Sequence, residues 1–560
     1  MHKLRAGPER RGVGWGSPMG RGRSGSGHAA RLFGVLVAAA VALTTVAPIP
    51  AQADGAVSLI VLEAQSSTSD VAALIEQAGG EVTAELGLID GFAATLPADG
   101  IAVLSAHPDI ASVMADGQVE LTGWNYAGED QESVAMITNS IANADHYWNE
   151  GFTGAGIGVA LIDSGISPVD GLTVDGKVIN GPDLSFESQD PSLTYVDSYG
   201  HGTHLAGIIA GRDDAAPAKI TTKEGKRYFL GMAPDAHIVN VKVATRNGAT
   251  DVSQVIAAID WVVQHRNDKG MNIRVLNLSF GTDSTQSYLL DPLAFAVEQA
   301  WQHGIVVVVA AGNDGNKSRL RNPATDPFVI AVGAVDANST SRTSDDVIPS
   351  FSSCGTADRH VDLVAPGQSV VSLLAPGSAA ATEHPGSIVD GRYIVGSGTS
   401  QAAAVVSGAA ALLLEQRPNL TPDQVKAVLT GSASEIRRVG ATCQGAGVLD
   451  LKSAFGYRTP RAVQSFPHSE GRGSLDAARG SSRVAHDGIV LEGEQDIMGN
   501  KWNGASWSSL AALGASWSGG TWNGASWSGA SWSGASWSGA SWSGNAWLGV
   551  SWDGPALLIV

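Results

Sequence analysis

Four polar residues of types that can break an amide bond stand in four separate stretches of this 560-residue chain. Asp163 follows the apolar run 157–162, His201 stands between two glycines, Asn313 follows Gly312, and Ser400 follows Thr399. An aspartate that orients a histidine, a histidine that takes a proton and a serine that attacks form a nucleophilic triad. An asparagine amide can donate a hydrogen bond to the oxyanion that forms. The four residues therefore predict hydrolysis through a covalent serine intermediate.

Ser400 stands near the start of a predicted helix, because the glycine-rich approach 395–398 gives way to an apolar run that ends at Leu414. Thr399 is the expected N-cap. A helix start offers unpaired N–H groups and the positive end of the helix dipole, and both favour negative charge on a neighbouring oxygen. A capped, close-packed helix without chemistry would show the same pattern. The other three residues therefore carry the catalytic interpretation.

The chain order Asp163, His201, Ser400 belongs to one of the convergent triad families and differs from the chymotrypsin and α/β-hydrolase orders. No Gly-x-Ser-x-Gly motif surrounds Ser400, which argues against an esterase built on the hydrolase fold.

Residues 141–455 resemble the subtilisin-like (subtilase) serine proteases. The likeness rests on the stretches 157–165, 199–207, 310–313 and 398–402. The resemblance implies that Asp163, His201 and Ser400 are catalytic and that Asn313 binds the oxyanion. One residue departs from the family pattern: Gln401 stands where the family usually has methionine, which changes the polarity beside the serine.

The resemblance also implies two backbone segments that flank the substrate. Strand edges there would bind an extended peptide by adding a strand, although both segments could be ordinary strand ends. The expected substrate-binding residues are Ser279, Phe280, Gly281, Ala310, Ala311 and Gly312. Arg321 is expected at the base of the pocket for the residue before the scissile bond, where it would favour acidic or polar side chains. The alternative is that Arg321 points to solvent.

The elements that must position these residues alternate between strands and helices. The expected strands are 157–162, 237–243, 274–280, 305–310, 328–335 and 363–366, and the expected helices include 252–266, 292–302 and 422–432. Apolar strands without alternation indicate a parallel sheet covered by helices on both faces. The expected fold class is therefore α/β and subtilisin-like, with the site at the carboxyl ends of the strands. The catalytic domain is expected over 122–456.

Two expected segments precede this domain. Residues 1–53 combine basic residues, an apolar run and a small-residue cleavage site, which is typical of a signal peptide and predicts secretion. Residues 54–121 show the strand–helix–strand–strand–helix–strand order of a ferredoxin-like α+β unit. That unit resembles the inhibitory propeptide of subtilases, so the chain's own propeptide is an expected partner. Its eleven acidic residues and lack of Lys or Arg favour apolar docking onto an acidic enzyme.

Two further segments follow. Residues 457–500 are rich in Arg, Ser, Gly and Asp, which predicts a linker. In 501–553 tryptophan recurs every five residues from Trp502 to Trp552, interrupted only at Ala512. A period of five fits neither a helix nor a strand. A β-solenoid, self-association and a surface for a partner such as a cell-wall polymer remain open hypotheses. A catalytically silent surface protein that acts through these repeats is the alternative function.

Charge and cysteine content limit the remaining possibilities. Thirty-five basic against 54 acidic residues give a net charge of −19, which argues against nucleic-acid binding. Cys354 and Cys443 could form one disulfide or remain two buried thiols. His204 lies three residues after His201, but no third ligand has a matching spacing, so His204 is expected to be structural. No metal is needed for the chemistry, and the resemblance implies only that structural calcium is possible. Protein or peptide substrates are the expected external partners.

Overall fold

The computed structural model describes residues 56–64, 69–86, 91–115, 134–188, 190–481, 483–486, 489–496, 501–512, 521–522 and 525–526. The chain divides into two compact units, Met1–Gly117 and Gln118–Val560, which are considered separately. The predicted signal peptide and the junction after the first unit lie outside the described residues.

The first unit contains one four-stranded antiparallel sheet in the order β2-β3-β1-β4, with two helices. Its elements are β1 (Ala56–Glu63), α1 (Val71–Gln77), β2 (Glu81–Leu86), β3 (Gly91–Pro97), α2 (Ala98–Ser105) and β4 (Ile110–Ala115). Leu59 and Val61 of β1 and Leu96 of β3 pack with Ile75 of α1 and Leu104 of α2 in a separate core. The predicted ferredoxin-like order is confirmed, because alternate strand residues supply the face that the helices bury.

The second unit is built on a seven-stranded parallel sheet in the order β11-β10-β9-β8-β5-β7-β6. Its strands are β5 (Gly158–Asp163), β6 (Val178–Asp183), β7 (His237–Lys242), β8 (Ile273–Leu278), β9 (Val306–Ala310), β10 (Ile330–Val335) and β11 (Leu363–Pro366). Six of them, all except β6, consist mostly or wholly of buried residues. The predicted α/β class is confirmed.

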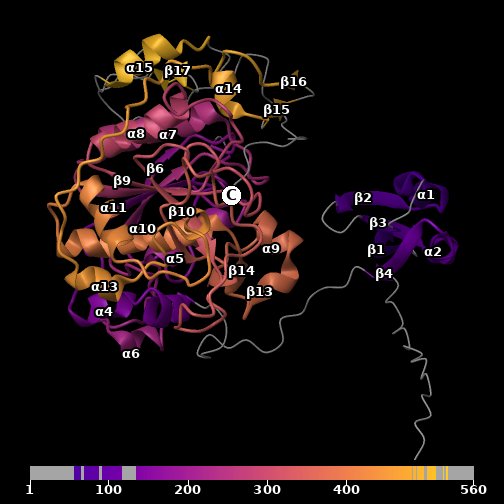
Figure 1. Ribbon diagram of the computed structural model, residues 1–560, viewed down its shortest axis with the longest axis horizontal. Helices are drawn as coiled ribbons and strands as arrows, with labels where there is room; N and C mark the ends of the chain where they lie inside the picture. The colour runs from indigo at the N-terminus through magenta and orange to yellow at the C-terminus, as the bar shows by residue number, and fades with distance from the viewer. Residues whose placement is uncertain are drawn as a thin grey trace, which may run out of the picture. The chain divides into compact units, whose positions relative to one another are not determined.

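Helices cover both faces of this sheet (Figure 1). One face carries α5 (His201–Ala210) and α10 (Thr399–Gln416), and the other carries α7 (Val252–His265) and α8 (Pro292–Gln302). Around them lie α3 (Val134–Met136), a π-helix (Ile137–Ile141), α4 (Ala144–Asn149), α6 (Thr222–Gly225), α9 (Ala379–Glu383), a 3₁₀ turn (Pro385–Ser387), α11 (Pro422–Gly431), α12 (Ala441–Gln444) and α13 (Leu451–Gly456).

Two features of the sheet regions were not predicted. The edge strand β6 contains Gly181 and Pro182 and is only partly buried, so it lacks the apolar run that marks the central strands. A small antiparallel sheet also forms in the order β12-β14-β13, from β12 (Val370–Leu373), β13 (Ile388–Val389) and β14 (Tyr393–Gly396). Its strands are too short to give a periodic signal.

The stretch expected to be a linker, 457–500, belongs to the second unit, and its helical part packs against α7 and α8. Its ordered elements are α14 (Leu475–Arg479), β15 (Ala485–His486) and β16 (Ile489–Val490). Leu475, Ala478 and Arg479 are buried, and α14 lies beside α7 and α8 (Figure 1). Composition alone predicts that an arginine is solvated, whereas the side chain of Arg479 is buried and forms an ion pair with Asp251, which is far away in the sequence. We call residues 457–512 the C-terminal strap.

The strap ends in α15 (Gly504–Ala512), which lies against α8. Trp502 and Trp507 are buried, and the ring of Trp507 meets that of Phe295 with a centroid distance of 5.3 Å. The first two repeats therefore pack on the catalytic unit, and 504–512 are helical rather than a coil of a β-solenoid. Beyond Ala512 the described residues are only β17 (Thr521–Trp522) and β18 (Ala525–Ser526), so most of the remaining repeat residues lie outside them.

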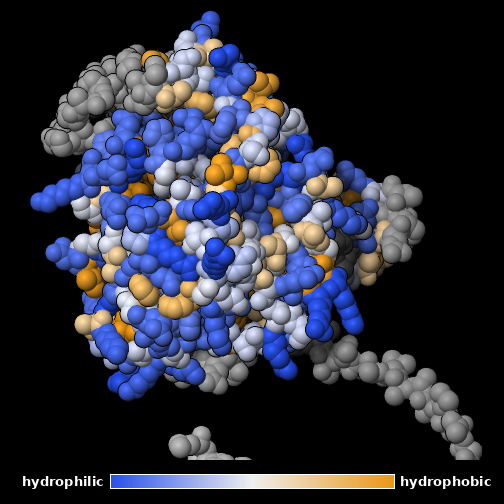
Figure 2. Space-filling view, turned by 60° about the vertical axis from the view of Figure 1, so that its left-hand side comes forward, coloured by the Kyte–Doolittle hydropathy of each residue, from blue (hydrophilic) through white to orange (hydrophobic). Residues whose placement is uncertain are grey.

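Cys354 and Cys443 form a disulfide, which decides between the two alternatives that the sequence left open. In the described part of the chain no helix is both long and apolar enough to cross a bilayer. Hydrophilic residues cover most of the face seen in Figure 2, and hydrophobic residues appear there in small separate patches.

Candidate active site

Asp163 and His201 meet at the carboxyl edge of the parallel sheet. Asp163 is the last residue of β5 and His201 the first residue of α5. The Nδ1 atom of His201 lies 2.9 and 3.0 Å from the two carboxylate oxygens of Asp163. Because a carboxylate can only accept, Nδ1 carries the proton and Nε2 has a free lone pair. The backbone N–H of Ser164 also donates to Asp163, over 2.8 Å, and holds the carboxylate in place.

Ser400 lies in the first turn of α10, but Thr399 is not the N-cap that the sequence predicted. Gly398 occupies the cap position and Thr399 is the first helical residue. The backbone N–H and the hydroxyl of Thr399 donate to Oδ1 of Asn313 over 2.9 and 3.1 Å. The hydroxyl of Thr399 also accepts from the N–H of Gly312 over 3.1 Å. Thr399 thus joins the start of α10 to the loop that carries Asn313.

These bonds orient the side-chain amide of Asn313. Its oxygen is occupied by Thr399, so the Nδ2 donor is the atom left for a ligand. A Cβ atom built on Gly398 would lie 3.0 Å from this Nδ2 atom. The donor therefore lies beside the backbone two residues before Ser400, where an oxyanion formed at Ser400 would need it.

The hydroxyl of Ser400 is buried and has no hydrogen-bond partner among the residues that the structure describes. A bond between Ser400 and His201 is therefore not formed in this structure. Catalytic hydrogen bonds are often long without substrate and shorten when substrate binds. An unpaired serine hydroxyl in the first turn of a helix has the chemistry of a nucleophile that a base can activate.

The two expected substrate segments follow neighbouring strands. Residues 279–281 come directly after β8, and 310–312 include the last residue of β9. The side chain of Phe280 is fully buried in the core, so only its backbone can face a ligand. The N–H of Ala311 donates to Val332 in the neighbouring strand, and its carbonyl accepts from the N–H of Arg321 over 2.9 Å.

Arg321 lies between these two segments. A Cβ atom built on Gly281 or on Gly312 would come within 2.6 Å of the side-chain stem of Arg321, so both positions need glycine. The guanidinium group makes a two-bond ion pair with Asp314, in which Nε donates over 2.6 Å. This pairing raises the pKa of Arg321. Only 14% of the side chain is exposed, so Arg321 does not extend into solvent.

The sequence reasoning did not single out Asp314, although it directly follows Asn313. Its position, next to the oxyanion asparagine and seven residues before Arg321, is the sequence feature that could have predicted its pairing with Arg321.

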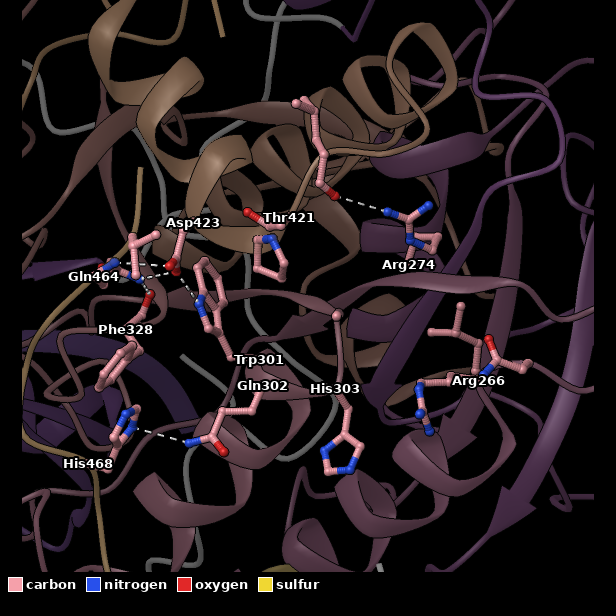
Figure 3. Close-up of a pocket in the computed structure, with 16 residues that line it drawn as sticks. Arg266, Arg274, Trp301, Gln302, His303, Phe328, Thr421, Asp423, Gln464 and His468 are labelled. Carbon is pink, nitrogen blue, oxygen red and sulfur yellow. Dashed lines mark hydrogen bonds between the residues drawn. The ribbon is translucent and has the colours of Figure 1, made fainter. Parts of the chain in front are cut away.

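A larger cavity lies away from these residues, at the amino-terminal edge of the sheet (Figure 3). Its volume is about 610 Å³. Arg266 and Arg274 line it, but their guanidinium groups donate to backbone carbonyls near helix ends, those of Val263 and Pro418. Asp423 accepts from Trp301 and from Gln464. The side chains of Arg266, Arg274 and Asp423 thus already form hydrogen bonds with other groups of the protein.

The described residues contain no group of three or more His, Cys, Asp or Glu side chains placed to hold a metal ion. His204 is buried, and its Nε2 atom lies 3.2 Å from the carbonyl oxygens of Val370 and Ile394. Burial lowers the pKa of His204 to about 4, so the ring stays neutral. The possible structural calcium remains a prediction that no carboxylate cluster in this part of the chain supports.

Comparison with known proteins gives two family matches. Residues 36–116 match a family described as a peptidase inhibitor domain. This match begins within the stretch expected to be the signal peptide. Residues 154–473 match the subtilase family, and this match extends into the C-terminal strap.

Individual relatives agree with these matches. Serine protease AprX of Bacillus subtilis (strain 168) is 35% identical over 309 residues, which cover 54% of this chain and 66% of AprX. Subtilisin E of the same organism is 32% identical over 386 residues, which cover 68% of this chain and 84% of subtilisin E. A crystal structure of a cold adapted subtilisin-like serine proteinase is 31% identical, with a TM-score of 0.39, and covers 54% of this chain and 89% of that one. Because the subtilase family matches more than half of the chain, this chain belongs to the subtilase family of serine proteases.

Proposed function

We propose that Asp163, His201 and Ser400 carry out the peptide-bond hydrolysis of this subtilisin-type endopeptidase, with Asn313 as the oxyanion donor. The observation that supports this most is the double contact of His201 Nδ1 with the Asp163 carboxylate, at 2.9 and 3.0 Å, together with a buried Ser400 hydroxyl that has no partner among the described residues. The described residues offer nothing that favours the alternative of a silent interaction protein.

In the first step Nε2 of His201 takes the proton of Ser400 as the Ser400 oxygen attacks the substrate carbonyl carbon. The negative charge on the carbonyl oxygen is received by Nδ2 of Asn313 and by the N–H of Ser400. The tetrahedral intermediate then expels the amine, which takes the proton from His201, and the acyl group stays on Ser400. Water attacks the ester by the same route in reverse order. Asp163 keeps the imidazole in the required tautomer throughout.

Labelling with a peptide phosphonate tests this assignment, because the probe forms a bond to an activated serine. The wild-type protein is expected to take up one equivalent at Ser400, and Ser400→Ala none. Ser453→Ala, which changes an exposed serine of α13, is the matched control and should label like wild type. Equal labelling of wild type and Ser400→Ala would remove Ser400 from this role.

The ion pair between Arg321 and Asp314 is expected to determine which side chain the enzyme prefers in the residue before the scissile bond. The resemblance puts Arg321 at the base of the pocket for the residue before the scissile bond, and two observations support this: the fit of its stem between Gly281 and Gly312, and its low exposure. Since Asp314 compensates the guanidinium charge, the preference for acidic side chains should be weaker than Arg321 alone would give.

The two single variants separate these contributions. Arg321→Gly leaves the carboxylate of Asp314 unpaired and should shift preference toward Lys and Arg. Asp314→Asn leaves the guanidinium unpaired and should shift preference toward Asp and Glu. Profiling a peptide library with both variants measures the shifts. Unchanged profiles for both would place the pair outside the pocket.

The remaining assignments concern processing and location. Residues 1–53 are proposed to direct secretion, 54–121 to inhibit the enzyme before cleavage, and 122–456 to form the catalytic domain with the strap attached. The match of 36–116 to an inhibitor domain and a relative named as a minor extracellular protease support a secreted precursor. Attachment to a cell surface through the repeats of 501–553 is a further proposal. The N-terminal sequence and intact mass of the mature protein would test these boundaries together.

A further inference from the structure

A second cavity, of about 330 Å³, opens beside His201. It is formed by the start of α5, by α9 with the residue after it, by the end of β14 and by Gln401 of α10. The segments 279–281 and 310–312 do not line it. We call it the His201-side cavity, and its lining includes Tyr199, Glu383 and His384.

Gln401 is the unusual residue of this cavity. Only 6% of the residue is exposed. Among the described residues the structure holds no hydrogen bond of its amide group. The Nε2 atom lies within 2.8 Å of the position that a Cβ atom on Gly396 would take, so glycine at 396 makes room for the amide. The amide atoms themselves are not fully buried, so a ligand in the cavity can reach them and pair with them.

The charge of the cavity is negative. Glu383 lies exposed at its rim, and no Lys or Arg is among the described lining residues. Burial raises the pKa of the Tyr199 hydroxyl, and the nearby carboxylates of Asp163, Glu383 and Asp197 raise it further. The histidines are weak counter-charges: His204 stays neutral, and His384 is exposed to solvent.

The direction of the reaction tells which half of a substrate this cavity can hold. His201 hands its proton to the leaving nitrogen, so the leaving half of the peptide lies on the His201 side. The acyl half lies along 279–281 and 310–312, which border Arg321 instead.

We propose that the His201-side cavity binds the side chain of the residue after the scissile bond, that Glu383 selects a basic side chain there, and that Gln401 binds the backbone of the same residue. The proposal rests on the proposed function of Ser400 and His201. A lysine or arginine would lay its stem along the half-buried ring of Tyr199 and bring its charged end to Glu383. The amide of Gln401 would pair with polar backbone of the same residue.

An acyl-transfer experiment tests this without a change of the acyl half. A peptide ester acylates Ser400, and the acyl-enzyme is then divided between water and an added amino acid amide. The amine nitrogen attacks the ester carbon and gives its proton to His201, which returns a proton to the departing oxygen of Ser400. The ratio of the peptide product to the hydrolysis product therefore reports binding in the His201-side cavity.

Wild type is expected to capture argininamide about two- to fivefold better than leucinamide, the range for a partly exposed ion pair. Glu383→Gln should bring that ratio close to one. Gln401→Met should lower capture of both amides about equally, because it removes a backbone contact. Glu435→Gln, which changes an exposed glutamate outside this cavity, is the matched control and should keep the wild-type ratio.

Equal capture of the two amides by wild type, or an unchanged ratio in Glu383→Gln, would overturn the proposal while ester hydrolysis continued. Absence of ester hydrolysis by wild type would overturn the proposed function itself, and this inference with it.

Discussion

Replacing Arg479 by methionine removes the guanidinium group that neutralises the carboxylate of Asp251. Both side chains are buried, with exposures of 1% and 2%. Nε of Arg479 donates to Asp251 over 2.7 Å, and its two terminal nitrogens donate to the carbonyl oxygens of Gly493 and Gln495 over 2.9 and 2.6 Å. Asp251 also caps α7 through the N–H of Ser253. One side chain thus joins the strap to the catalytic unit and leaves no buried charge unpaired.

The expected cost follows from this burial. Removing one partner of a buried ion pair costs about 3–5 kcal/mol, because the other charge stays in a poorly solvated place. Methionine keeps most of the stem, so the loss reports the charge and its hydrogen bonds rather than a cavity. Arg483→Met is the matched control in the same strap. Its side chain is 24% exposed and lies 3.4 Å from Asp476, so its loss should cost at most about 1 kcal/mol.

Equilibrium unfolding in urea, in a Ser400→Ala background that prevents self-digestion, measures both variants. Limited proteolysis should also cut the strap of Arg479→Met between 457 and 500 earlier than that of Arg483→Met. The double variant Asp251→Asn with Arg479→Met should recover part of the loss, since no unpaired charge remains. A loss below about 1 kcal/mol for Arg479→Met, equal to the control, would refute the reasoning.

Three further predictions concern other parts of the chain. The disulfide closes a loop across a sequence separation of 89, so the double variant Cys354→Ser with Cys443→Ser should lose about 4.5 kcal/mol of unfolding free energy in the chain-entropy account; an unchanged urea midpoint would contradict it. Residues 54–121 added in trans should inhibit the mature enzyme with little dependence on salt, because both partners are acidic; inhibition that weakens steeply with salt would point to a local charged patch. His204 has a folded pKa of about 4 against about 6.5 when unfolded, so the unfolded state binds more protons between these values. Stability from His204 is therefore complete above pH 6.5 and falls by up to about 3 kcal/mol as pH drops to 4; His204→Gln should show a shallower slope, and an equal slope would contradict the assignment.

The sequence alone determined the order and type of most elements. Central strands such as β5, β9 and β10 are almost wholly apolar runs, and this signal is local in the chain. The four polar residues at Asp163, His201, Asn313 and Ser400 were also readable, because each stands in a short motif next to such an element. Edge strand β6 escaped detection because half-buried residues and a Gly-Pro pair carry no period.

Tertiary structure decided what depends on partners far apart in the chain. Arg479 is buried only because Asp251, 228 residues earlier, supplies the opposite charge, and no local pattern distinguishes it from a solvated arginine. The same holds for Thr399, which the sequence placed as a cap and the fold uses to hold Asn313, 86 residues away. The periodicity of a sequence shows which residues face the core. The role of a polar side chain depends instead on the group that the fold brings next to it. The distance between the two groups is set by tertiary packing and not by their spacing along the chain.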